Sequence, residues 1–143
     1  MKLRVILIFT CIFTFQVCKA QKYPIKDKTT YYLNSIFIGG KKNALVRDKG
    51  HIVFDLKANE ATCFTSCNFV KLKVKIKDQS IKFTTAVPAK TPCPDHLLGI
   101  EEDIKENLPK INNYTVKGNQ LILMKDKDVL IIFTESGIEG VKK

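Results

Sequence analysis

Cysteine and histidine side chains offer the widest chemistry in this sequence. Cys63 and Cys67 lie four positions apart, and His96 follows Cys93 by three positions. Three thiols and one imidazole could hold zinc in a tetrahedral site. Paired ligands in zinc knuckles are usually separated by two residues, and the spacing of Cys63 and Cys67 is wider. We therefore expect no metal.

A disulfide is the alternative use of these thiols. We expect Cys93 to pair with one of the two earlier cysteines and favour Cys67, with Cys63 as the alternative partner. Cys67 stands next to a predicted hairpin that leads straight to the loop carrying Cys93. The bridge would close a short loop and add about 3 kcal/mol to stability.

The sequence offers few residues for nucleophilic catalysis. The histidines are His51 and His96, and His96 could activate Cys93 only if that thiol were unpaired. We expect His51 to be exposed at the start of a strand and His96 to be exposed in the first turn of a helix. The sequence predicts no enzyme, no catalytic residue and no cofactor.

Three further patterns have simpler interpretations. The acidic residues Glu101, Glu102, Asp103 and Glu106 are spaced as the solvated face of a helix. The residues Gly39-Gly40-Lys41-Lys42 lack the spacing of a phosphate loop and indicate a turn. The aromatic residues are scattered singly and tryptophan is absent, so we expect no stacking platform for bases or sugars.

The N-terminus has the layout of a secretory signal peptide. Lys2 and Arg4 precede an apolar run over residues 5–17, and Cys18-Lys19-Ala20 supplies small residues at the cleavage positions. The run is shorter than the roughly 20 apolar residues that a spanning helix needs. We predict cleavage after Ala20, export to the periplasm or extracellular space, and no remaining transmembrane segment.

Cleavage would change both the thiols and the charge. Residues 15–17 lack the leucine and small residues of a lipobox, so we expect no lipid on Cys18. Three basic residues and two cysteines leave with the signal peptide, which lowers the net charge from +10 to +7 and leaves three thiols. Lysine far outnumbers arginine and alternates along the predicted strands, so the charge is most simply a solvated surface. The partner stays unknown, with an envelope protein or an anionic polymer as the possibilities, and we expect no specific nucleic-acid binding and a monomer.

Alternation of apolar and polar residues predicts a mainly β fold. In residues 71–77 lysines alternate with Leu72, Val74 and Ile76, which should face a core, and a turn at Asp78-Gln79 leads back through 80–84. The other predicted strands are 30–38 (with an irregularity), 52–56, 114–116, 121–124 and 129–133.

The spacing of apolar residues changes from every second residue to every third or fourth between the predicted hairpin and the C-terminal strands. Apolar residues recur at steps of three and four from Leu97 to Ile111, which predicts one helix over about residues 96–108, capped by Asp95 and ending near Pro109. Short antiparallel hairpins with a single helix predict one antiparallel sheet curled into a small barrel, with the helix closing one end.

The chain therefore divides into four predicted segments. They are a signal peptide (1–20), a flexible leader (21–29), one domain (30–134) and a flexible tail (135–143).

The order of several short motifs resembles that of the META domain (HslJ-like) family. The chain carries Cys67-Asn68, an alternating hairpin, a proline-rich loop ending in Cys93-Pro94-Asp95, an acidic helix over 100–108, and Tyr-Thr-Val-Lys-Gly-Asn-Gln-Leu at 114–121. The family shows Gly-Cys-Asn, Thr-x-x-x-Cys-Pro, a helix containing glutamate, and Tyr-x-Val-x-Gly-Asn-x-Leu in this order. The likeness covers about residues 30–133.

Four positions depart from the family pattern. Ser66 stands where the family has glycine, and Cys63 also replaces a usual glycine. Ala89 replaces a threonine, and Tyr31 or Tyr32 takes the place of a tryptophan in the first strand. These changes indicate a divergent member.

The resemblance implies a small barrel-like domain, secreted or attached to the envelope and linked to stress. It brings no catalytic residue or cofactor, and Cys67, Asn68, Cys93 and Pro94 are structural motif positions. We therefore expect a bacterial exported, non-enzymatic envelope or stress-related factor. The alternatives are a barrel holding a small ligand, which an interior cavity would favour, and a basic surface that binds anionic envelope glycans or lipids.

Overall fold

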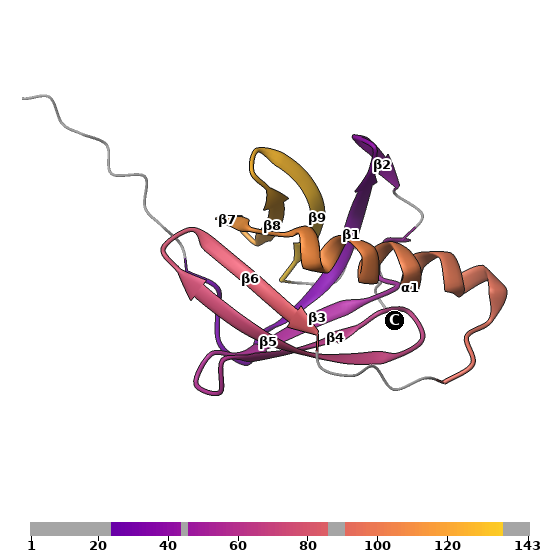
Figure 1. Cartoon of the computed structure of the whole chain (residues 1–143), viewed down its shortest axis with the longest axis horizontal. Helices are drawn as coiled ribbons and strands as arrows, with labels where there is room; N and C mark the ends of the chain where they lie inside the picture. The colour runs from indigo at the N-terminus through magenta and orange to yellow at the C-terminus, as the bar shows by residue number, and fades with distance from the viewer. Residues whose placement is uncertain (1–23, 44–45, 86–90, 136–143) are drawn as a thin grey trace, which may run out of the picture.

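The described part of the chain folds into a sheet of nine strands with one α-helix (Figure 1). The computed structural model describes residues 24–43, 46–85 and 91–135. The strands are β1 (Thr30–Ile38), β2 (Lys41–Asn43), β3 (His51–Asp55), β4 (Glu60–Phe64), β5 (Phe69–Lys77), β6 (Ser80–Thr85), β7 (Asn113–Lys117), β8 (Gln120–Lys125) and β9 (Asp128–Thr134). The helix α1 (Asp95–Asn107) is followed by a short 3₁₀ helix, η2 (Leu108–Lys110). The predicted signal peptide lies outside the described residues.

The sheet closes into a barrel of antiparallel strands. Each barrel strand pairs with the next along the chain, and β1 pairs with both β3 and β9, which completes a ring of eight strands. The ninth strand, β2, pairs with β1 beside the ring, so Lys41 and Lys42 lie in a strand and not in the predicted turn. The register of β1 shifts between Leu33 and Ser35. The mainly β barrel and the irregular first strand are both confirmed.

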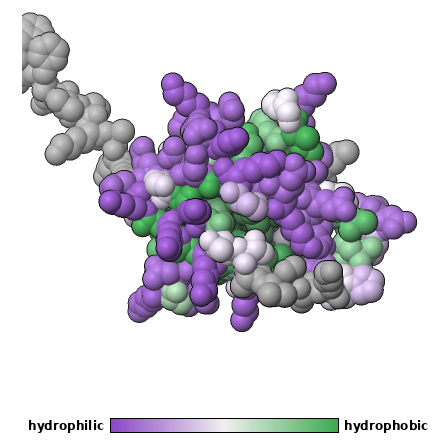
Figure 2. All heavy atoms as spheres, in the orientation of Figure 1, coloured by the Kyte–Doolittle hydropathy of each residue, from purple (hydrophilic) through white to green (hydrophobic). Residues whose placement is uncertain are grey.

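Side chains fill the interior of the barrel. All eight ring strands contribute buried apolar residues to one cluster, and the largest fully buried members include Tyr31, Leu33, Ile52, Phe54 and Phe133. Hydrophilic side chains cover much of the face seen in Figure 2, with hydrophobic ones showing between them. Apolar side chains inside the barrel and polar side chains outside it are what the alternating sequence predicts.

The hairpin of β5 and β6 forms as predicted, with one exception. Leu72 and Val74 are buried, but Ile76 is 36% exposed. Ile76 lies near the hairpin tip, where it lines a surface hollow of about 250 Å³ together with Ile25 and Tyr114. Ile76 is thus partly exposed because the other strands of the barrel do not cover the tip of this hairpin.

Residues 24–29, assigned from the sequence to a flexible leader, are packed against the barrel. Ile25 is buried in the core, and the backbone N–H of Lys28 donates to the carbonyl of Phe54 at 2.8 Å. Lys26 also forms an ion pair with Glu135 at 2.6 Å, so the first residue of the predicted tail is tied down as well. The rest of the leader and of the tail lies outside the described residues.

The helix α1 lies at the end of the barrel where β3 begins and β4 ends. Its Ile104 methyl group lies 3.6 Å from the position that a Cβ at Gly50 would take, just before β3. The helix begins after Pro94, and no side chain caps its first turn, so the predicted capping role of Asp95 is wrong. Asp95 is instead the first helical residue, where its negative charge suits the helix dipole. None of the helices in the described part of the chain is long and apolar enough to cross a membrane.

Candidate functional site

The loop between β4 and β5 carries the first family motif in a strained conformation. Ser66 has a φ of +76°, in the left-handed region that favours glycine. Its hydroxyl donates a hydrogen bond of 2.6 Å to the carbonyl of Lys49. The backbone N–H of Thr65 donates a hydrogen bond of 2.8 Å to the carbonyl of Asn68. The backbone of this turn would suit glycine, which stands at this position in the motif that the sequence resembles.

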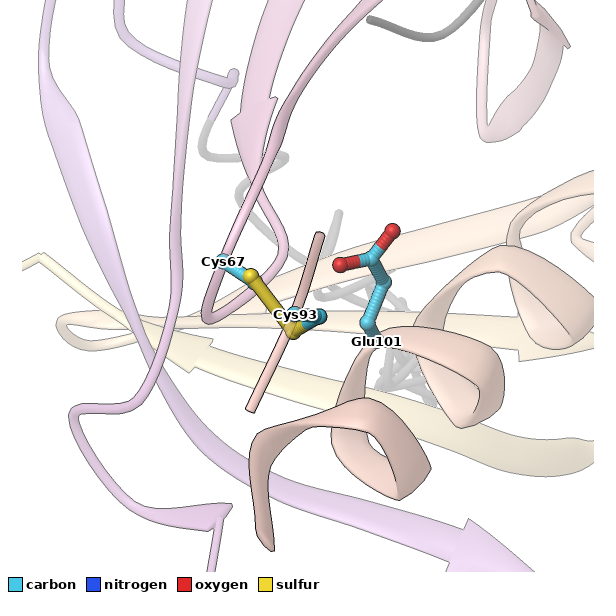
Figure 3. Close-up of side chains that lie close together, drawn as sticks. All are labelled: Cys67, Cys93 and Glu101. Carbon is cyan, nitrogen blue, oxygen red and sulfur yellow. A yellow bond between two sulfur atoms is a disulfide. The ribbon is translucent and has the colours of Figure 1, made fainter. Parts of the chain in front are cut away.

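Cys67 in this loop lies opposite Cys93, which precedes α1. The two Cα atoms are 5.7 Å apart and the sulfurs are within disulfide distance (Figure 3). The pair favoured from the sequence is therefore the pair that the fold brings together. Cys63, the alternative partner, is buried in the core on β4, and burial raises the pKa of its thiol to about 12.

Asn68 joins the loop to the helix. Its side-chain amide donates to both carboxylate oxygens of Glu101, at 3.1 and 2.8 Å, and to the carbonyl of Thr91 at 3.2 Å. The backbone N–H of Thr91 donates in return to the Asn68 side-chain carbonyl at 3.0 Å. One amide thus holds the loop, the segment before α1 and α1 itself.

Glu101 corrects the prediction for the acidic run. Its side chain is buried, whereas Glu102 and Glu106 are exposed, so the run is not wholly a solvated face. Lys105, one turn later on α1, forms an ion pair with Glu101. A buried carboxylate must be paired and hydrogen-bonded to be tolerated, and Asn68 and Lys105 supply these contacts.

The structure does not assemble the zinc set considered from the sequence. The atoms that come within 4.8 Å of one another belong to Cys67, Cys93 and Glu101, without Cys63 or His96. The two sulfurs face each other, and the carboxylate is held by the neighbouring amide and ammonium groups. The donors are thus occupied by internal contacts, and the arrangement acts as a clamp. We refer to Cys67, Asn68, Cys93 and Glu101 as the clamp.

The two histidines have different surroundings. His96 is exposed in the first turn of α1, as predicted. His51 begins β3 as predicted but is partly buried among Tyr32, Phe64 and Phe69, and this burial lowers its pKa. Its expected full exposure is therefore wrong.

The same contacts overturn the expectation that the aromatic residues stand singly. Tyr32 lies opposite His51, His51 opposite Phe64, and Phe64 opposite Phe69, on four neighbouring strands. The successive ring centroids are 6.1, 5.4 and 4.9 Å apart. We call these four side chains the aromatic row. Residues far apart in the sequence form it, so a scan for adjacent aromatic residues misses it.

A second feature of the surface is a groove of about 540 Å³. It lies between the β1–β2 turn at Gly39 and Gly40, the second half of α1, and the β8–β9 turn. Asp103 lines it, and burial together with the nearby Glu106 and Glu102 raises the pKa of that carboxyl. The glycine turn therefore borders a groove of mixed charge.

A model of the META domain matches residues 24–137. The chain belongs to the META domain family. The matched range includes every residue of the clamp and of the aromatic row.

Solved structures share the fold of this META domain at low sequence identity. A protein from Burkholderia xenovorans, solved by NMR, is 20% identical with a TM-score of 0.64, over 77% of this chain and 83% of the other. A DUF4847 family protein from Bacteroides vulgatus is 12% identical with a TM-score of 0.61, over 80% of this chain and 97% of the other. Among curated proteins, no sequence matches this chain.

Proposed function

We propose that this META domain protein is exported and acts as a non-enzymatic structural or binding factor of the cell envelope. The observation that carries the proposal is the filled barrel. Leu33, Ile52 and Phe133 are fully buried among side chains from the whole ring. A small guest inside the barrel would have to displace such residues, so binding is left to the outer surface.

The state of the clamp supports the same proposal. Cys93 faces Cys67 at disulfide distance, so its thiolate is not available to His96 for catalysis. Disulfides persist in oxidising compartments, which agrees with a chain that leaves the cytoplasm. The clamp residues then serve to fix the β4–β5 loop and α1 on the barrel.

Export is tested by expressing the full chain and sequencing the N-terminus of the protein recovered outside the cytoplasm. We expect it to begin at Gln21 and to carry no lipid. The control is the double variant Ile8→Asp with Ile12→Asp, which breaks the apolar run of the signal peptide and should keep the protein inside. An uncleaved chain found in the cytoplasm in both cases would contradict the proposal.

A further inference from the structure

The aromatic row lies across the outer face of the barrel. Successive residues on a strand point to opposite faces, and Ile52, Cys63 and Val70, which neighbour row members, point into the core. Phe69 is 56% exposed and Tyr32 is 37% exposed. Four strands at the usual spacing make the row about 14 Å long. The row runs from Tyr32 to Phe69, and its members Phe64 and Phe69 flank the β4–β5 loop that carries the clamp.

A strip of lysines starts beside the row. On the outer face of β5, Lys71 follows Phe69 on the same side, and further lysines alternate to the end of the strand. The exposed lysines of this strip are Lys71, Lys73, Lys75, Lys77 and, on β6, Lys82. None of them forms an ion pair with another residue in the part of the chain that the structure describes. We call this set the lysine strip.

Few acids balance the lysine strip. Glu60 on β4 lies opposite Lys73 of β5. Asp55 of β3, which lies on the other side of Glu60, forms an ion pair with Lys28. The outer face of β5 and β6 therefore carries an excess of cations next to exposed rings, with Glu60 opposite Lys73 and Asp78 after Lys77 as the nearby acids. Such a face repels a second copy of itself and attracts an anion.

The shape of the row narrows the class of anion. The ring centroids of Phe64 and Phe69 are 4.9 Å apart, which leaves no room for a base between these two rings. The members of the row lie on strands, not on a loop that could insert into a membrane. The rings are tilted to their neighbours by 57°, 31° and 42°, so each exposed ring offers its own face, on which the C–H groups of a partner can pack.

We propose that the aromatic row and the lysine strip together bind a linear anionic polysaccharide. Sugar rings pack on Tyr32, Phe64 and Phe69, and carboxylate or sulfate groups of the same polymer pair with the lysine ammonium groups. This proposal rests on the proposed function, because export places the protein where such polymers occur. It assigns the binding role to one face of the barrel.

The test measures binding of polygalacturonate and of chondroitin sulfate by calorimetry at near-physiological salt, with the exported protein purified from cells expressing the full chain. Phe69→Ser and the double variant Lys71→Gln with Lys73→Gln should each weaken binding of at least one polymer by tenfold or more. Ile38→Ser and Lys127→Gln are the controls, since both residues are exposed away from this face. Both controls should bind as the parent does.

A ring-free polyanion separates stacking from charge. Inorganic polyphosphate should lose affinity in the lysine variant and keep it in Phe69→Ser. Thermal unfolding of each variant checks the fold, and Tyr32→Ser provides a second, independent change in the row.

The proposal is overturned if neither polysaccharide binds at this salt, or if Phe69→Ser and Tyr32→Ser both bind as the parent does. It is also overturned if a single-stranded oligothymidylate or a polyglutamate peptide binds more tightly with the same dependence on Phe69. Failure of binding by a protein that is exported and begins at Gln21 refutes this proposal alone. A chain retained in the cytoplasm refutes the proposed function.

Discussion

The side-chain amide of Asn68 donates hydrogen bonds to both oxygens of the Glu101 carboxylate, at 3.1 and 2.8 Å, and so ties the β4–β5 loop to α1. The two residues are 33 positions apart, and the contact is buried. It secures the helix on the barrel with a polar contact beside the apolar packing of Ile104. Because the Glu101 carboxylate is buried, a substitution of either Asn68 or Glu101 should lower the stability of the domain.

Loss of the Asn68 amide should therefore destabilise the domain. Asn68→Ala leaves Glu101 with Lys105 as its remaining partner, and we expect a loss of about 2 kcal/mol in the free energy of unfolding. Glu101→Gln should also destabilise, whereas Glu102→Gln, on the exposed side of α1, should change stability by less than about 0.5 kcal/mol. Urea unfolding measures all three, and equal effects of the two glutamine variants would refute a special role for Glu101.

We expect Cys67 and Cys93 to form a disulfide and the thiol of Cys63 to be unreactive. We expect mass spectrometry of the exported protein to show Cys67 linked to Cys93, and native alkylation at pH 8 to leave Cys63 unmodified because its pKa is about 12. Replacing both Cys67 and Cys93 by serine should cost about 3 kcal/mol. Three alkylated cysteines in the native protein would contradict this assignment.

How far the sequence predicts this molecule depends on the range of the interactions involved. The lysine alternation of residues 71–77 predicts β5 because a strand with one wet face has a local period of two. The sequence does not predict β4, because the alternation of Glu60–Phe64 is carried by Ala61 and Cys63, which are weakly apolar signals. β3 and β7 are as short as β4 and are predicted, so the strength of the alternation decides, and not the length of the strand.

The site shows the same limit. Cys67 and Cys93 could be paired from their places beside a hairpin, but Glu101 was assigned to solvent because of its charge. Its position argued otherwise: it lies three residues before Ile104 and four after Leu97, on the apolar stripe of the helix. The aromatic row could not be read from the sequence at all, because it depends on the register of four strands.

Ser66 offers a test of backbone strain that isolates one cause. Ser66→Ala and Ser66→Gly both remove the 2.6 Å hydrogen bond to Lys49, but only glycine adopts the φ of +76° without a steric cost. We expect the glycine variant to be more stable than the alanine variant by about 1 kcal/mol. Thermal unfolding of the pair measures the difference, and equal stabilities would show that the turn relaxes without strain.

Two glycines should respond oppositely to the same substitution. A Cβ at Gly50 would lie 2.7 Å from the carbonyl oxygen of Phe64, whereas a Cβ at Gly99 in α1 meets nothing within 4 Å. Gly50→Ala should therefore destabilise the domain, because backbone atoms must move apart. Gly99→Ala should stabilise it by about 0.5–1 kcal/mol, because alanine favours the helix. Chemical denaturation measures both, and a stabilising Gly50→Ala would contradict the close approach.

His51 should make stability depend on pH. Its pKa in the folded state lies below its ordinary value of 6.5, because burial among Tyr32, Phe64 and Phe69 disfavours the charged imidazolium. Below pH 6.5 the unfolded chain therefore binds more protons than the folded one, and the contribution of His51 to stability falls as the pH is lowered. Above that value the contribution is constant.

The substitution His51→Phe removes the titrating group and keeps a ring in the row. The difference in unfolding free energy between this variant and the parent should be flat from pH 8 to 7 and should shift in favour of the variant from pH 6.5 to 5. If this difference stays flat from pH 8 to 5, the burial of His51 does not affect its protonation, and its ring is more open to water than the contacts with Tyr32, Phe64 and Phe69 indicate.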